Sequence, residues 1–260
     1  MVIPFFKYQG TGNDFVMIDN RTNIFDKANL DMVKHLCDRK FGVGADGLIL
    51  IENSSEFDFD MIFFNPDGSQ SFCGNGSRCA VAFAKYLGII DNQAYFNSTD
   101  GEHEAWVSAN GDVSLKMHDV KTIEKGDGYY FIDTGSPHYV KEESNVNELD
   151  VIAEGRTIRY NDRFKAEGTN VNFVKYNQES LDIRTYERGV EGETLSCGTG
   201  VTAAALSWAD KFKLSSGKVD VNAQGGKLSV GFKRNENGFN DIWLIGAATY
   251  VFKGEFEVNE

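Results

Sequence analysis

A Cys-Gly-x-Gly turn followed at once by an alanine-rich segment occurs twice in this chain of 260 residues. The first copy is Cys73-Gly74-Asn75-Gly76 and the second is Cys197-Gly198-Thr199-Gly200. Two copies of one turn predict an internal duplication, because a repeated element usually marks a repeated structural unit. We therefore expect two similar domains, each containing one copy of the turn and the helix that follows it.

The segments around these copies indicate short strands more than helices. Apolar runs over 2–8 and 15–19 flank a Gly- and Asn-rich loop, which is typical of two paired strands. Asn110-Gly111 and Gly225-Gly226 each separate two strand-like runs, as in β-hairpins, so the sheets should be largely antiparallel. Helices are expected over 30–41, 77–87 and 201–212. The fold class is α/β of the α+β type.

The polar stretch 118–128 is the best candidate for a linker, since it carries charges and glycines and no apolar periodicity. It divides the chain into an N-terminal domain of 1–118 and a C-terminal domain of 119–260. Each part then contains one alanine-rich helix and several strands.

Composition excludes several classes of partner. The net charge of −13 repels nucleic-acid backbones and anionic lipids, so we expect no nucleic acid and no membrane partner. No apolar run is long enough to span a bilayer, and the first residues lack a secretory leader, which makes the cytoplasm the expected location. The four cysteines match neither a disulfide framework nor a structural zinc site, so no metal is expected.

The repeated turn has a chemistry of its own. Its glycines expose backbone N–H groups at a helix start, where the helix dipole adds partial positive charge. Such a site binds a carboxylate and favours thiolate over thiol, which lowers a cysteine pKa below about 8.5. Two such starts meeting at one carboxylate would place Cys73 and Cys197 on opposite faces of its α-carbon. The alternative is two tight turns with buried cysteines, which is also our interpretation of Cys37 and Cys79.

Two glycine patterns have to be weighed against this hypothesis. Residues 42–47 fit Gly-x-Gly-x-x-Gly, and residues 198–203 fit its alanine-ended variant. The first follows a helix and precedes a strand, and the second is followed by a hairpin, so neither has the context of a dinucleotide site. A nucleotide-dependent oxidoreductase remains the enzyme alternative. An amino-acid-binding protein or a thiol switch is the non-enzyme alternative.

Four sequence blocks together carry a family resemblance that covers nearly the whole chain. They are Gln9-Gly10-Thr11-Gly12-Asn13-Asp14-Phe15, Phe64-Asn65-Pro66-Asp67-Gly68-Ser69, Cys73-Gly74-Asn75-Gly76-Ser77-Arg78-Cys79 and the run 187–200 from Glu-Arg-Gly to Cys-Gly-Thr-Gly. They resemble the diaminopimelate epimerase family, and the last block is the most specific. Proline racemases and phenazine-biosynthesis isomerases are similar more distantly and lack that block.

The resemblance implies two domains, each a mostly antiparallel sheet wrapped round a central helix, with the active site in the cleft between them and the final strand returned to the first domain. It implies an isomerase that interconverts LL- and meso-diaminopimelate, in lysine and peptidoglycan synthesis, without a cofactor. A small molecule would be the only ligand required. A racemase of another amino acid, of histidine or proline type, is the alternative on the same fold. Sequence leaves monomer and homodimer both open.

The resemblance also assigns roles by position. Cys73 and Cys197 match the acid–base pair, with His138 and Glu187 near the reacting centre. Residues matching substrate contacts are Asn13, Asn65, Gly74, Asn75, Asn170, Glu187, Arg188, Gly198 and Thr199. Each single residue has a structural alternative: the asparagines as loop formers, His138 as a core residue, and Glu187 with Arg188 as a surface ion pair.

This chain departs from the family pattern at two positions. Many members have Gln where Gly47 stands and Asn where Ser136 stands. Both positions line the pocket in the family, so contacts to the substrate should be rearranged here.

Overall fold

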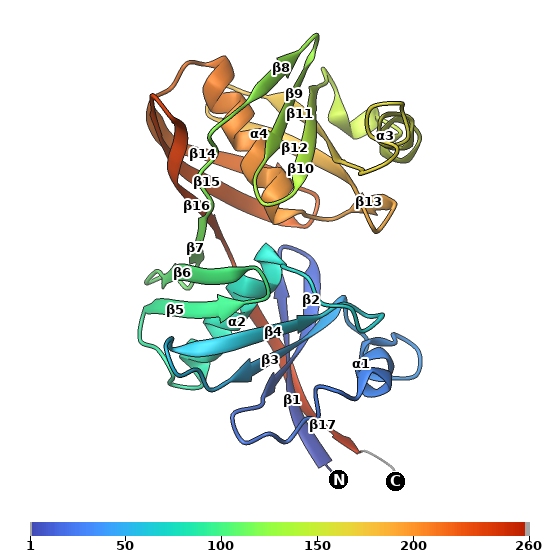
Figure 1. Cartoon of the computed structure of the whole chain (residues 1–260), viewed down its shortest axis with the longest axis vertical. Helices are drawn as coiled ribbons and strands as arrows, with labels where there is room; N and C mark the ends of the chain where they lie inside the picture. The colour runs from blue at the N-terminus through green and yellow to red at the C-terminus, as the bar shows by residue number, and fades with distance from the viewer. Residues whose placement is uncertain (1, 258–260) are drawn as a thin grey trace. The chain divides into compact units, whose positions relative to one another are not determined.

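The computed structural model describes residues 2–257, and its contacts divide the chain into two compact units. The first unit takes Met1–Leu115 and Gly246–Glu260, and the second takes Lys116–Ile245 (Figure 1). The chain first passes from one unit to the other between Leu115 and Lys116. The linear range 119–260 does not form one unit, because the last strand pairs with the first strand of the chain, Val2 opposite Glu257 and Gln9 opposite Thr249.

The first unit is a curved sheet around one helix. Its strands are β1 (Val2–Gly10), β2 (Asn13–Asp19), β3 (Gly47–Glu52), β4 (Phe59–Phe64), β5 (Gln93–Ser98), β6 (Gly101–Val107), β7 (Val113–Met117), which runs over the boundary, and β17 (Thr249–Glu257). They pair in the order β17-β1-β2-β3-β4-β5-β6-β7. Only β2–β3 and β4–β5 are parallel among these pairs. The helices are α1 (Leu30–Cys37) and α2 (Gly74–Tyr86), and α2 contacts β1, β2, β3, β4 and β6.

The second unit repeats this plan. Its strands are β8 (Glu124–Gly126), β9 (Tyr129–Asp133), β10 (Pro137–Glu142), β11 (Asn170–Tyr176), β12 (Ser180–Glu187), β13 (Gly192–Thr194), β14 (Ser216–Ala223), β15 (Gly226–Asn235) and β16 (Gly238–Gly246). The helix α4 (Gly198–Lys211) contacts β9, β10, β11, β12, β14 and β15. A short 3₁₀ turn (Val146–Glu148) precedes α3 (Val151–Arg159), which packs on β11 and β12. The pairs β10–β11 and β12–β14 are parallel, while β8–β9, β9–β10, β11–β12, β12–β13 and β14–β15 are antiparallel.

The two central helices are almost entirely buried because their residues are small. Gly, Ala, Ser and Thr dominate α2 and α4, and residues 74–81 and 200–210 are buried throughout. Small side chains let the strands approach the helix axis closely, so a single helix can pack against most strands of the sheet around it. The predicted fold class, with mostly antiparallel sheets and few helices, is confirmed.

All three predicted helices differ from the structure at one or both ends. Both alanine-rich helices begin three residues earlier than the sequence predicted, so that Cys73 and Cys197 become their N-cap residues. The first helix ends at Cys37 and not at residue 41. Asp38 takes an extended backbone there, and its carboxylate accepts the N–H groups of Lys40 and Phe41, which turns the chain away. The sequence prediction missed α3.

Candidate active site

Cys73 is placed at the start of α2 by the turn that caps the helix. Its backbone is extended, with φ −138° and ψ 106°, and its sulfur accepts the N–H of Gly76 at 3.4 Å. Its carbonyl oxygen accepts the N–H of Ser77 at 2.8 Å, which begins the helix. The side chain is half-buried, so the sulfur lies at a helix start and is not enclosed in the core. A thiolate there is stabilised by backbone N–H groups and by the helix dipole.

Two of the predicted asparagines surround this turn. Asn75 is buried, and its amide nitrogen lies 3.4 Å from Oδ1 of Asn13. The same oxygen lies 3.7 Å from Sγ of Cys73. The structure therefore brings Asn13, Cys73, Gly74 and Asn75 together within the first unit.

Cys197 occupies the same local position in the second unit. Its φ of −120° and ψ of 113° match those of Cys73, and its carbonyl oxygen accepts the N–H of Val201 at 2.8 Å. Its sulfur lies 3.4 Å from the hydroxyl oxygen of Thr199, whose carbonyl oxygen accepts a bond from Thr134 Oγ1 at 2.8 Å. Cys197 is also half-buried, while Gly198 is buried at the helix start.

The other two cysteines have a different environment. Cys37 and Cys79 lie in apolar surroundings, and burial raises the pKa of each thiol to about 12. A thiol with that pKa is almost never ionised near neutral pH and is a poor candidate for acid–base chemistry. The core role that the sequence predicted for both is consistent with this placement.

His138 is a neutral imidazole on β10 that lies against the first turn of α4. A Cβ atom at Gly200 would come within 3.3 Å of its ring carbon Cε1. Asn172 accepts the Thr185 hydroxyl through Oδ1 at 3.0 Å, so its Nδ2 donates to Nδ1 of the ring at 3.1 Å. This leaves the ring proton on Nε2, a buried atom with no hydrogen-bond partner among residues 2–257. Burial, assisted by the charge of Arg188, lowers the pKa of His138 to about 3.

The buried imidazole predicts a specific pH dependence of stability. Below an unfolded pKa of about 6.5 the unfolded chain binds a proton that the folded ring excludes until about pH 3, so stability falls as pH decreases through this range. The His138 contribution has a slope of up to about 1.4 kcal/mol per pH unit. The free energy of unfolding, measured with urea at pH 7 and at pH 5, should therefore decrease less between these two pH values in His138→Gln than in the unaltered protein. Equal losses in the two proteins would contradict the neutral, buried imidazole.

Arg188 is held at its backbone and leaves its guanidinium near the surface. Its N–H donates to Oδ1 of Asn170 at 2.9 Å, while its side chain donates to the carbonyl oxygen of Glu167 at 3.0 Å and to the hydroxyl of Ser136 at 3.4 Å. Asn170 in turn donates to the same Ser136 hydroxyl at 3.2 Å. Within residues 2–257 no carboxylate pairs with this guanidinium, so the surface ion pair with Glu187 does not form. Glu187 instead accepts the Thr194 hydroxyl at 2.8 Å.

Asn65 and Gly47 have local roles that the structure explains. Asn65 sits in the turn after β4, where its amide nitrogen donates to Ser69 and Ser71. Gly47 begins β3, and a Cβ atom there would lie 2.3 Å from the Phe63 ring and 2.7 Å from the Phe64 carbonyl oxygen. The Phe63 ring thus fills the space that a larger residue at position 47 would need. Glycine at this position is therefore required by the packing of Phe63.

Three polar residues near these side chains were not singled out by the sequence analysis. They are Arg78, which donates to Asn75, Asp46, which accepts from Asn13, and Asn172, which orients His138. Arg78 and Asn172 are fully buried. An arginine on the buried face of an alanine-rich helix is unusual enough to have been a signal, because charged residues are rarely buried without a partner.

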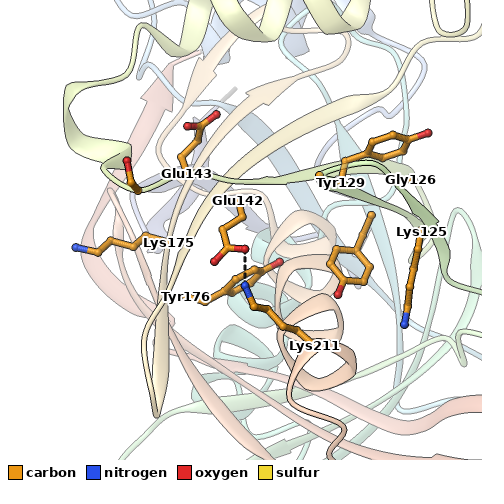
Figure 2. A pocket seen from close by; sticks show the side chains of 11 residues that line it. Lys125, Gly126, Tyr129, Glu142, Glu143, Lys175, Tyr176 and Lys211 are labelled. Carbon is orange, nitrogen blue, oxygen red and sulfur yellow. Dashed lines mark hydrogen bonds and ion pairs between the residues drawn. The ribbon is translucent and has the colours of Figure 1, made fainter.

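A cavity of about 680 Å³ lies elsewhere in the second unit (Figure 2). Its lining comes from β8, β9, β10, β11 and the far end of α4, and it contains none of the predicted site residues. Glu142 is paired with Lys211, and the Tyr176 hydroxyl is satisfied by Ser207 at 2.8 Å. With no thiol and no imidazole in its lining, this cavity is a weaker candidate for acid–base chemistry than the helix starts.

Residues 2–257 contain no group of three or more His, Cys, Asp or Glu side chains arranged to hold a metal ion. Across the same residues, none of the helices has the length and apolar character needed to cross a membrane.

Comparison with known structures supports the fold. A phenazine biosynthesis protein of the PhzF family from Bacillus anthracis superimposes with a TM-score of 0.77 at 14% identity, over 99% of this chain and 100% of that one. A hydroxyproline epimerase from Agrobacterium vitis gives 0.68 at 13% identity, over 98% and 91% of the two chains. At such low identity these matches show a shared two-domain fold and nothing about the reaction.

Sequence comparison is more specific. The family model described as diaminopimelate epimerase matches residues 5–123 and 130–251. A diaminopimelate epimerase from Flavobacterium psychrophilum is 50% identical over 250 residues, which is 95% of this chain and 98% of that protein. Another from Chlorobaculum tepidum is 42% identical over 255 residues, or 94% and 98% of the two chains. These matches over nearly the full length show that the chain belongs to the diaminopimelate epimerase family of isomerases.

Proposed function

We propose that this protein interconverts LL- and meso-diaminopimelate without a cofactor, with Cys73 and Cys197 transferring protons at one α-carbon. The observation that carries the proposal is the matched geometry of the two cysteines. Each caps an alanine-rich buried helix with the same extended backbone, and each remains half-buried, while the two remaining cysteines are enclosed in the core. The family relationship supplies the substrate class.

The proposed reaction needs one thiolate and one thiol. The thiolate takes the α-proton, and the electron pair of the broken C–H bond delocalises into the adjacent carboxylate. The thiol then gives its proton to the opposite face of the same carbon and becomes the thiolate. N–H groups at Gly74, Asn75, Gly198 and Thr199 are suited to stabilise the charge that develops on the carboxylate. For the other epimer the two cysteines exchange roles.

Further residues would bind and orient the substrate. Arg188, with its guanidinium unpaired by any carboxylate of the described chain, is suited to hold the remote carboxylate of diaminopimelate, and Asn170 fixes the Arg188 backbone. The neutral His138 can donate its Nε2 proton to a substrate atom near the α4 start. Asn13, Asn65 and Glu187 complete the proposed set, in which Asn65 and Glu187 offer carbonyl or carboxylate oxygens to an ammonium group.

The proposed role implies a reducing location. A reaction that depends on two free thiols requires a compartment that keeps thiols reduced, and the cytoplasm does so. We therefore place the protein in the cytoplasm, in the biosynthesis of lysine.

Solvent deuterium exchange tests the proposal directly. Purified protein in D₂O should incorporate deuterium at the α-carbon of LL-diaminopimelate and form the meso isomer, as measured by NMR and chiral chromatography. L-Histidine and L-proline serve as the controls for the racemase alternative. Exchange into either of these with none into diaminopimelate would overturn the proposed substrate, and no exchange into any of them would overturn the proposed chemistry.

A further inference from the structure

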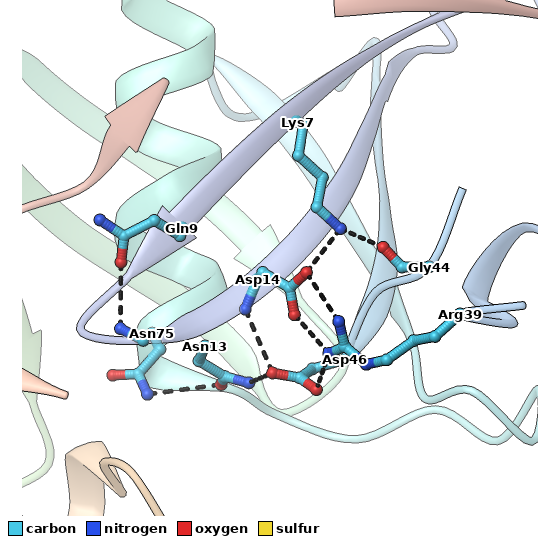
Figure 3. A network of polar contacts seen from close by, with 9 residues as sticks. Lys7, Gln9, Asn13, Asp14, Arg39, Gly44, Asp46 and Asn75 are labelled. Carbon is cyan, nitrogen blue, oxygen red and sulfur yellow. Dashed lines mark hydrogen bonds and ion pairs between the residues drawn. The ribbon is translucent and has the colours of Figure 1, made fainter. Parts of the chain in front are cut away.

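A continuous chain of polar contacts joins Cys73 to charged residues on both sides of it. On one side, Nη2 of the buried Arg78 donates to Oδ1 of Asn75 at 3.1 Å and to the Thr11 hydroxyl at 2.8 Å. On the other side, Nδ2 of Asn13 lies 2.6 Å from Oδ2 of Asp46 (Figure 3). The amide nitrogen of Asn75 meets the amide oxygen of Asn13 between these two ends, at 3.4 Å.

The two ends of this chain fix the orientation of both amides. A guanidinium can only donate hydrogen bonds, so Asn75 must turn its oxygen toward Arg78 and its nitrogen toward Asn13. An ionised carboxylate can only accept, so Asn13 must turn its nitrogen toward Asp46. Asn13 is thereby left with its oxygen facing both Asn75 and the sulfur of Cys73, which lies 3.7 Å away.

We infer that Asp46 and Arg78 are positioning residues that act through Asn13 and Asn75 to present a hydrogen-bond acceptor to the Cys73 thiol. The inference deepens the proposed function, because it rests on Cys73 being one of the two acid–base groups. An oxygen facing the sulfur stabilises S–H over S⁻, which opposes the preference of the helix start for thiolate. This balance makes the Cys73 thiolate a stronger base toward the α-proton, since the thiol that results is stabilised.

The acidic end is itself anchored. Arg39 bridges Asp46 and Asp14, at 2.6 Å from each, and Lys7 pairs with Asp14 at 2.6 Å. Burial opposes ionisation of Asp14, but the bonds and charges of Arg39 and Lys7 outweigh it and lower its pKa to about 2. The N–H of Asp14 also donates to Oδ2 of Asp46 at 3.2 Å. Asp46 is therefore held in place as an acceptor by groups that do not touch Cys73.

Other ionisable groups lie around Cys73 in this unit. Arg78 and Cys79 are on the same helix, where burial lowers the pKa of the Arg78 guanidinium and raises that of the Cys79 thiol. From β6, His103 stacks on Phe72 with ring centroids 4.8 Å apart, and it pairs with Asp100. A test of the inference must therefore separate the effect of the Asn13 orientation on Cys73 from the effect of nearby charges.

The experiment measures alkylation of each cysteine by iodoacetamide in the free enzyme between pH 5 and pH 10, with peptide mass spectrometry to resolve Cys73 from Cys197. Asp46→Asn offers Asn13 a partner that can also donate, so the Asn13 amide can turn its N–H toward the sulfur. The alkylation midpoint of Cys73 should then move to lower pH by about one unit, while that of Cys197 stays in place. Turnover should fall mainly in kcat.

Two companion variants separate orientation from charge and from damage to the fold. Asp14→Asn removes the same charge from the same cluster without touching Asn13, and it should shift the Cys73 midpoint by less than half as much. Asp46→Glu keeps a carboxylate at that end, so its Cys73 alkylation midpoint should stay close to that of the unaltered enzyme. Equal shifts in Asp46→Asn and Asp14→Asn, no shift in Asp46→Asn, or a full shift in Asp46→Glu would overturn the inference. Because no substrate is present, the outcome does not depend on which amino acid the enzyme turns over.

Discussion

Replacing Cys73 or Cys197 with alanine should lower epimerisation of diaminopimelate by about 10³-fold or more in each case, since each face of the α-carbon needs its own acid–base group. Both side chains are half-buried at helix starts, so their removal leaves no large cavity and the fold should survive. Serine should rescue little activity, because a hydroxyl is a far weaker acid than a thiol and is rarely available as the ionised base. The measurement is the initial rate with LL-diaminopimelate, followed by chiral chromatography.

Cys37→Ala is the matched control for this prediction. It removes a thiol from the hydrophobic core of the first unit, at a residue outside the proposed site, and should leave the rate near that of the unaltered enzyme while costing some stability. Near-normal turnover in either Cys73→Ala or Cys197→Ala would rule out the two-thiol mechanism. A loss of activity in Cys37→Ala without unfolding would show that the assay does not report on the site cysteines specifically.

Replacing Arg188 with methionine should reduce kcat/KM for diaminopimelate by about 100-fold, which corresponds to losing charge-assisted hydrogen bonds to the remote carboxylate. The kcat/KM of Arg188→Lys should lie between those of Arg188→Met and the unaltered enzyme, because lysine keeps the charge but not the planar guanidinium fork. The Arg188 backbone N–H still donates to Asn170 in both variants, so the local structure should be retained. Since binding of the remote group contributes to catalysis at the reacting end, kcat should fall as well as KM rise.

Steady-state kinetics with diaminopimelate and with L-lysine test this prediction. Lysine lacks the second carboxylate and should be a very poor substrate for the unaltered enzyme. Arg163→Met is a suitable control, because Arg163 is an exposed arginine of the same unit that pairs with Glu124 at 2.7 Å and has no part in the proposed site. Lysine turned over as efficiently as diaminopimelate would leave the two-cysteine mechanism standing and remove the proposed substrate.

Local patterns in the sequence were sufficient for much of the fold. The Asn110-Gly111 and Gly225-Gly226 turns predicted hairpins, and β6–β7 and β14–β15 do pair antiparallel there. Turn residues and apolar alternation act over a few neighbouring residues, so a single sequence reveals them. The helix α3 was missed because only two of its residues, Val151 and Gly155, are buried, which gives no long apolar stripe to detect.

The residues of the candidate site also divide into those that the sequence revealed and those that only the structure revealed. The duplicated turn singled out Cys73 and Cys197 because their chemistry depends on residues adjacent in the chain. The duplicated turn did not single out Asp46 or Arg78, since their contacts to Asn13 and Asn75 join segments separated along the chain or depend on the direction of a side chain. His138 was found by resemblance, but its neutral state follows from burial and from Asn172 on the neighbouring strand.

The sequence by itself thus determined the duplicated helix starts, the antiparallel character of the sheets and the pair of cysteines. Tertiary structure decided which polar groups surround each cysteine and how they are oriented. The cause is physical: the direction of an amide and the protonation of an imidazole depend on which donors, acceptors and charges lie within a few ångströms. Around Cys73 those neighbours come from three parts of the chain: the β1–β2 turn with Thr11 and Asn13, Asp46 before β3, and Arg78 on α2, and only folding brings them together.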